Sequence, residues 1–223
     1  MMLLAYLMSL LAWIVLVIFA WKSYHRRQYG AFFLTALGVK ALASLGITAI
    51  YVWFYKGGDT LSFFNDARLL IAFFSERPTE IISFLSGNSF LSSLGLRFEN
   101  DPRALFFSAF TALFVIMGAG NIWLSALWMS FFSLLCIWWS VQQISRENYF
   151  LGKACVWVLI CWPGILIWTS GIFKETPALV SLCLLSAMFY RAMHRAFDVK
   201  DFFICIVAIW LLWNLKYYYA AVF

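Results

Sequence analysis

The chain opens with an uninterrupted apolar run, since residues 2–21 contain no charged side chain. About 20 apolar residues are enough for a helix to cross the hydrocarbon layer of a membrane. Similar runs recur along the sequence, without the alternation of apolar and polar residues that a membrane β-barrel needs. We therefore predict an all-α protein, a polytopic transmembrane helical bundle with about six or seven membrane helices.

Composition supports a membrane rather than an aqueous setting. Hydrophobic residues make up 65% of the 223 residues and charged residues 12%, whereas soluble domains are nearer 45–50% apolar and about 25% charged. The net charge of +6 comes from basic residues in short loops, which is the positive-inside pattern of membrane proteins. We expect the lipid bilayer as partner and no nucleic acid.

We interpret residues 1–223 as a single integral membrane domain of a multi-pass protein. The predicted spans are 2–21, 31–55, 104–118, 122–143, 153–169, 177–190 and 202–216. The basic loops at 22–27, 144–152 and 191–201 are expected in the cytoplasm.

Residues 56–103 form the first large loop. They hold six of the ten acidic residues and five basic residues, so they lack a positive bias and are expected outside. Their apolar patches predict amphipathic helices lying on the membrane surface.

Residues 104–118 create a conflict of sidedness. Three full crossings between the 56–103 loop and residue 170 would place these two regions on opposite sides, while charge places both outside. A helix of this length spans roughly 22 Å, less than the ~30 Å of a bilayer core. We expect a partial or re-entrant helix here; a hidden crossing within 60–103 is the alternative.

The sequence stops in "LKYYYAAVF", an apolar run without a polar tail. This predicts the N-terminal part of a longer protein, with missing C-terminal spans or a partner subunit. The five cysteines lie in apolar segments and form no CxxC pair, which favours neither a zinc site nor a disulfide framework.

A stripe of polar residues follows the second predicted span. Its members recur at helical spacing and fall within about 80° of one another on one helix face: Lys40, Ser44, Thr48, Tyr51 and Tyr55. A lysine inside a span is costly and often functional. The stripe is predicted to line a cavity that is wet or enclosed by protein; the alternative is that Lys40 snorkels or pairs within the bundle.

The stripe points toward "YKGGDTLSFFNDARLL", residues 55–70. Gly57 and Gly58 permit a sharp turn or close approach of a ligand. Asp59 is a candidate catalytic residue, or alternatively only the N-cap of the following helix. Asp66 lies about two turns later on the same face. The two carboxylates could serve as base and ligand of a divalent metal, or Asp66 could simply pair with Arg68 or another surface charge.

A second polar stretch is "CWPGILIWTSGIFKETPALV", residues 161–180. Pro163 and Gly164 predict a kink, and Thr176 is the expected N-cap of the next helix. Lys174 then lies just before a helix N-terminus, which favours binding of a phosphate; the alternative is an ion pair with Glu175. Lys216 is a second candidate phosphate contact, within an aromatic cluster that could instead anchor the chain at the membrane surface.

The "GGDT" after an early span and "WPGILIWTSGIFKE" together resemble GT-C class membrane glycosyltransferases and related bacterial exopolysaccharide polymerases. The resemblance implies a polyprenyl-phosphate-linked sugar donor, a cell-envelope acceptor, and transfer on the external face of the bacterial inner membrane. By this resemblance Asp59 is the general base, and Lys174 neutralises the departing lipid phosphate with help from Lys216. Many members carry a second acid close to the first; here the next is Asp66.

Two alternatives stay open at this point. A transporter or flippase subunit would use Lys40 and the polar stripe along its pathway. A non-catalytic membrane assembly partner would need neither Asp59 nor Lys174.

Overall fold

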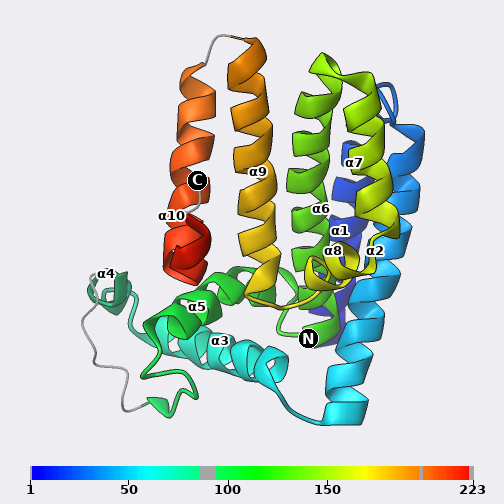
Figure 1. The fold of residues 1–223 in the computed structure, drawn as a ribbon. Helices are drawn as coiled ribbons and strands as arrows, with labels where there is room; N and C mark the ends of the chain where they lie inside the picture. Colours follow the sequence, from blue (N-terminus) through cyan, green and yellow to red (C-terminus); the bar gives the residue numbers. More distant parts are fainter. Residues whose placement is uncertain (1, 86–93, 196–197, 221–223) are drawn as a thin grey trace.

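The computed structural model describes residues 2–85, 94–195 and 198–220, and in these ranges its regular structure is helical throughout. Figure 1 shows a group of helices standing side by side and running in alternating directions: α1 (Met2–Tyr24), α2 (Ala31–Ala49), α6 (Ile122–Glu147), α7 (Tyr149–Cys161), α9 (Glu175–His194) and α10 (Val199–Ala220). Two further helices, α3 (Asp59–Glu76) and α5 (Pro102–Met117), lie across one end of this group. The short helices are α4 (Glu80–Leu85) and α8 (Pro163–Trp168). The all-α prediction is confirmed for the described residues.

Among the described helices, four are long and apolar enough to cross a membrane. These are α1, α6, α9, and α2 together with its continuation. The continuation is the π-helix η1 (Ile50–Tyr55), so the predicted span 31–55 is helical over its whole length but changes hydrogen-bonding pattern after Ala49. The prediction of a helical membrane protein is confirmed to this extent.

The turn after η1 depends on glycine. Gly58 has φ +95° and ψ 179°, a region that other residues rarely adopt because of their Cβ atom. Lys56 precedes it in the left-handed conformation. This turn redirects the chain from α2 into α3, which lies across the bundle end (Figure 1).

Helix α5 contains most of the problematic segment 104–118. It does not stand beside the bundle helices but lies across their end next to α3 (Figure 1). The ring of Phe63 on α3 meets Phe107 on α5 edge-on, with centroids 4.8 Å apart. Helix α5 is shorter than the four candidate membrane helices, and whether it crosses the membrane stays a prediction.

The predicted kink at Pro163 is confirmed and is a complete break. Helix α7 ends at Cys161, and Pro163 is the first residue of α8, where its missing N–H costs nothing. The predicted span 153–169 is thus two helices. The connection between α8 and α9, residues 169–174, is not part of a helix.

The basic loops share the end opposite α3 and α5 (Figure 1). Arg195, after α9, forms an ion pair of 2.5 Å with Glu147 at the end of α6. Gln142 on α6 donates to the backbone oxygen of Gln28 in the α1–α2 loop at 2.6 Å. The described parts of the three basic loops thus lie together, while their place relative to a membrane stays a prediction.

Candidate functional site

The polar stripe of α2 packs against the α8–α9 connection. Lys40 is 1% exposed, and its Nζ atom donates to the backbone oxygen and to Oγ1 of Thr169, both at 2.7 Å, and to Ser170 Oγ at 3.4 Å. The two polar stretches singled out in the sequence therefore meet inside the bundle. Of the alternatives for Lys40, the structure shows hydrogen bonding within the bundle.

Serine hydroxyls of α6 complete this buried contact. Ser133 Oγ donates to the Thr169 oxygen at 2.6 Å, and Ser130 Oγ donates to the Lys40 oxygen at 3.3 Å. Non-helical backbone at membrane depth is tolerated where protein covers it. Lys40 and the two serines cover the non-helical backbone between α8 and α9.

The rest of the stripe divides into a buried and an exposed part. Ser44 and Thr48 are buried, and Thr48 Oγ1 donates to the Ser44 backbone oxygen at 2.8 Å. The ring of Tyr51 lies 5.8 Å from that of Phe173, whereas Tyr55 is exposed. The buried part of the stripe thus faces protein, and the cavity-lining role of the stripe stays a prediction.

Asp59 lies at the α3–α5 end with its side chain exposed. It is the first residue of α3, while the N-cap is Gly58 and no side chain caps the helix. The N-cap prediction for Asp59 is therefore wrong by one residue. Within the described part of the chain, no hydrogen bond or ion pair engages its carboxylate, which is free for other chemistry.

The first turns of α3 bring Asp59 into the neighbourhood of Lys174. Thr60, next to Asp59, donates from Oγ1 to the Ile172 oxygen at 3.3 Å. Lys174 Nζ lies 5.3 Å from the ring centre of Phe63, one turn after Asp59. The structure therefore places Asp59 and Lys174 at the same end of the bundle.

Asp66 has a different environment and a structural role. It is 3% exposed, and its two carboxylate oxygens accept the backbone N–H groups of Arg97 and Phe98 at 3.1 and 3.2 Å. It pairs neither with Arg68 nor with another charged side chain among the described residues. Asp66 thus ties the chain before α5 to α3, and its oxygens are not directed at a shared site with Asp59.

In the described part of the chain, these acids form no metal site. Among the described residues, no group of three His, Cys, Asp or Glu side chains comes close enough to hold a metal ion. The suggested divalent metal at Asp59 and Asp66 has no support from the donor set, because Asp66 is committed to backbone amides.

Lys174 lies at the N-terminus of α9, as predicted, and is itself the N-cap residue, but its partner is not Glu175. Its Nζ atom lies 3.3 Å from Asp101 Oδ2 and 5.8 Å from the ring centre of Phe98. The N-cap prediction for Thr176 is wrong, because its hydroxyl donates to the oxygens of Trp168 and Gly171 at 3.0 and 2.8 Å. Thr176 closes the α8–α9 connection instead of capping α9.

Lys216 is the residue that pairs with Glu175. The two side chains are 2.7 Å apart, and they join α10 to the first turn of α9. Helix α10 kinks here, because Lys216 has the non-helical angles φ −147° and ψ 72°. Both predicted phosphate-binding lysines therefore lie at the α3–α5 end, each beside a carboxylate.

Asp101 is a functional candidate that sequence reasoning missed. It caps α5 by accepting the N–H groups of Arg103 and Ala104, while its other oxygen accepts from Lys174. Partial burial raises the pKa of Asp101, but the hydrogen bond from Ala104 and the nearby Lys174 charge outweigh this and lower its pKa below the usual value. The one available signal was the Asp-Pro pair before an apolar run, typical of a helix start.

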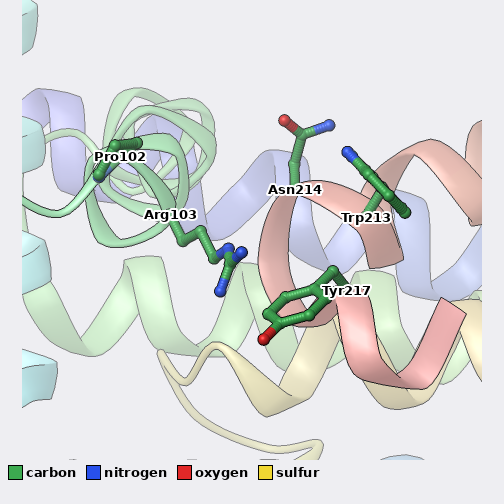
Figure 2. Close-up of a pocket in the computed structure, with 5 residues that line it drawn as sticks. All are labelled: Pro102, Arg103, Trp213, Asn214 and Tyr217. Carbon is green, nitrogen blue, oxygen red and sulfur yellow. The ribbon is translucent and has the colours of Figure 1, made fainter. Parts of the chain in front are cut away.

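Arg103 is the second missed residue. Its guanidinium carbon lies 4.1 Å from the ring centre of Tyr217. Arg103 and Tyr217 line a pocket of about 260 Å³ between α5 and α10, together with Pro102, Trp213 and Asn214 (Figure 2). Arg103 and Tyr217 are 114 positions apart in the sequence, which gives no sign that they meet.

A comparison with protein-family models, curated proteins and solved structures found no match.

Proposed function

We propose that this chain is a membrane glycosyltransferase that transfers a sugar from a polyprenyl-phosphate-linked donor to a cell-envelope acceptor. The observation that carries the proposal is the position of Asp59. Its free, exposed carboxylate lies at the same end of the bundle as Lys174 and Lys216. The resemblance of the "GGDT" and "WPGILIWTSGIFKE" stretches to GT-C class enzymes supports the same assignment.

The proposed membrane arrangement has the upright helices α1, α2, α6, α7, α9 and α10 crossing the bilayer. Helices α3, α4 and α5 then lie along the external surface, which suits their direction in Figure 1. The basic loops at the opposite end face the cytoplasm, in accordance with the positive-inside rule. The membrane in this proposal is the bacterial inner membrane.

The proposed reaction uses Asp59 as general base. Its carboxylate accepts the proton of the acceptor hydroxyl while the hydroxyl oxygen bonds to C1 of the sugar. The bond between C1 and the phosphate oxygen breaks, and its electron pair leaves with the lipid phosphate. A nearby cation such as Lys174 stabilises this developing negative charge.

Substitution of Asp59 tests this function. Purified protein in liposomes is supplied with a polyprenyl-phosphate-linked sugar and an extract of cell-envelope acceptors, and sugar transfer is measured. Asp59→Asn should reduce transfer at least about a hundredfold, without changing the thermal unfolding temperature. Glu76→Gln, in the exposed last turn of the same helix, is the matched control and should transfer at the normal rate. Normal activity of Asp59→Asn would remove the base assignment.

One observation weighs against the transporter alternative. Lys40 was its central residue, and Lys40 is bonded to Thr169 inside the bundle rather than facing a pathway. The assembly-partner alternative predicts that both Asp59→Asn and Lys174→Gln leave the biological process intact.

A further inference from the structure

The cations at the α3–α5 end differ in whether they have a carboxylate partner. Lys174 is beside Asp101 and Lys216 is beside Glu175, so each lysine has a carboxylate partner. Arg103 has no carboxylate within ion-pair distance in the described part of the chain. It is therefore the uncompensated positive charge at the place where α5, α9 and α10 meet.

The orientation of Arg103 leaves its hydrogen-bond donors free. The guanidinium lies over the Tyr217 ring, so the ring covers one face of the group. All five N–H donors of an arginine point outward in the guanidinium plane, and no side-chain or backbone acceptor among the described residues takes them. A stacked guanidinium with an open edge is the geometry that binds a phosphate through two parallel hydrogen bonds.

The pocket wall adds donors and apolar surface. Asn214 uses one amide hydrogen on the Trp210 oxygen at 2.8 Å, which leaves its second amide hydrogen available. Trp213 and Tyr217 are both largely exposed and are residue types that favour the boundary between membrane and water. Figure 2 shows Arg103 extending from α5 toward Tyr217 on α10, and Asn214 and Trp213 on α10 also line the pocket.

From this geometry we propose that the pocket between α5 and α10 binds the phosphate group of a lipid, with Arg103 as the main contact. The volume of about 260 Å³ is below the ~300–1,000 Å³ of pockets that enclose a drug-sized ligand, which suits a phosphate headgroup rather than a whole glycolipid. Binding of the phosphate is independent of the transfer reaction. Assignment of this phosphate to the sugar donor rests on the function proposed above.

The test measures binding without any sugar. Purified protein in detergent is titrated with farnesyl phosphate, with farnesol, with a short-chain phosphatidylglycerol and with inorganic phosphate, and the dissociation constants are compared. Farnesyl phosphate should bind and farnesol should bind at least about tenfold more weakly. Arg103→Gln should weaken farnesyl phosphate binding at least about tenfold, as expected for loss of hydrogen bonds to a charged group.

A second arginine provides the matched control. Arg77 is also exposed at this end, and its guanidinium carbon lies 5.4 Å from the ring centre of Phe73. Arg77→Gln removes the same charge and the same kind of ring contact but should leave binding unchanged. Thermal unfolding of both variants verifies that they are folded.

The four ligands distinguish between the possible sources of the bound phosphate. If phosphatidylglycerol alone binds in an Arg103-dependent way, the site takes a membrane phospholipid. If inorganic phosphate binds as tightly as farnesyl phosphate, or if Arg77→Gln and Arg103→Gln weaken binding equally, the lipid-phosphate site is overturned. If Asp59→Asn loses sugar transfer but binds farnesyl phosphate normally, phosphate binding at Arg103 does not depend on the transfer reaction at Asp59.

Discussion

The ammonium group of Lys40 lies 2.7 Å from both the backbone oxygen and the hydroxyl of Thr169, 129 residues later in the chain. No carboxylate accompanies this buried cation among the described residues. Its three acceptors also have other partners: Ser133 donates to the Thr169 oxygen, and the hydroxyls of Thr169 and Ser170 donate to backbone oxygens of α8. Removing Lys40 therefore leaves none of them without a hydrogen bond.

Lys40→Met should consequently leave stability unchanged or raise it. A buried charge without a counter-ion loses its hydration, and even the replacement of buried ion pairs by apolar residues is often neutral or stabilising, by about 1–4 kcal/mol. Thr169→Val should instead lower the free energy of unfolding by about 1.5–3 kcal/mol, because the charge stays and loses an acceptor. Thermal and denaturant unfolding in detergent measure both.

The double variant separates the two effects. Lys40→Met combined with Thr169→Val should recover most of the stability lost in Thr169→Val alone, because the buried charge is gone. If Lys40→Met alone unfolds the protein, the ammonium is a structural requirement of the α8–α9 connection and this account of its energetics is wrong.

Asp66 and Asp59 form a natural pair for comparison on α3. Asp66→Ala leaves two backbone N–H groups, those of Arg97 and Phe98, without their acceptor. Each such group costs about 1–3 kcal/mol when buried, so the free energy of unfolding should fall by about 2 kcal/mol or more. Asp59→Ala should change it by less than about 0.5 kcal/mol, as expected for an exposed side chain without partners. Equal losses in the two variants would contradict the structural role of Asp66.

Asp101 predicts a pH dependence of stability. Its pKa is lowered in the folded protein, so the folded state binds this proton more weakly than the unfolded state does. The contribution of Asp101 is therefore complete above its unfolded pKa and is lost as the pH falls through the lowered folded value. The effect is modest because the side chain is 52% exposed.

The measurement is the unfolding temperature between pH 7 and pH 3. Wild type should lose more stability on acidification than Asp101→Asn, whose cap retains a side-chain oxygen but no longer titrates. Identical acid profiles for the two proteins would argue against a lowered pKa at Asp101.

Sequence patterns predicted most helices because apolar runs, helix breaks and turns depend on residues that are neighbours in the sequence. The break at Pro163 and the turn at Gly58 are of this local kind. The partners of Lys174 and Lys216 were not predictable, because Asp101 and Glu175 become neighbours only through packing of α5, α9 and α10. Arg103 and Tyr217 were missed for the same reason, while Thr176 carried a local N-cap signal that tertiary hydrogen bonds to Trp168 and Gly171 override.

The proposed arrangement in the membrane makes a final prediction about sidedness. Single cysteines are introduced at Arg26, Lys200 and Thr79 in a background whose five native cysteines are replaced by alanine. All three positions are exposed. Arg26 lies in the loop after α1, Lys200 in the first turn of α10, and Thr79 between α3 and α4. With right-side-out vesicles and a membrane-impermeant maleimide, Thr79→Cys should react in intact vesicles. Arg26→Cys and Lys200→Cys should react only after the vesicles are opened. In the proposed arrangement the chain between these two positions crosses the bilayer an even number of times, so both lie on the cytoplasmic side.

Reaction of Thr79→Cys and Lys200→Cys from the same side would mean that α5 does cross the bilayer. Asp59 and Lys174 would then lose their shared external surface.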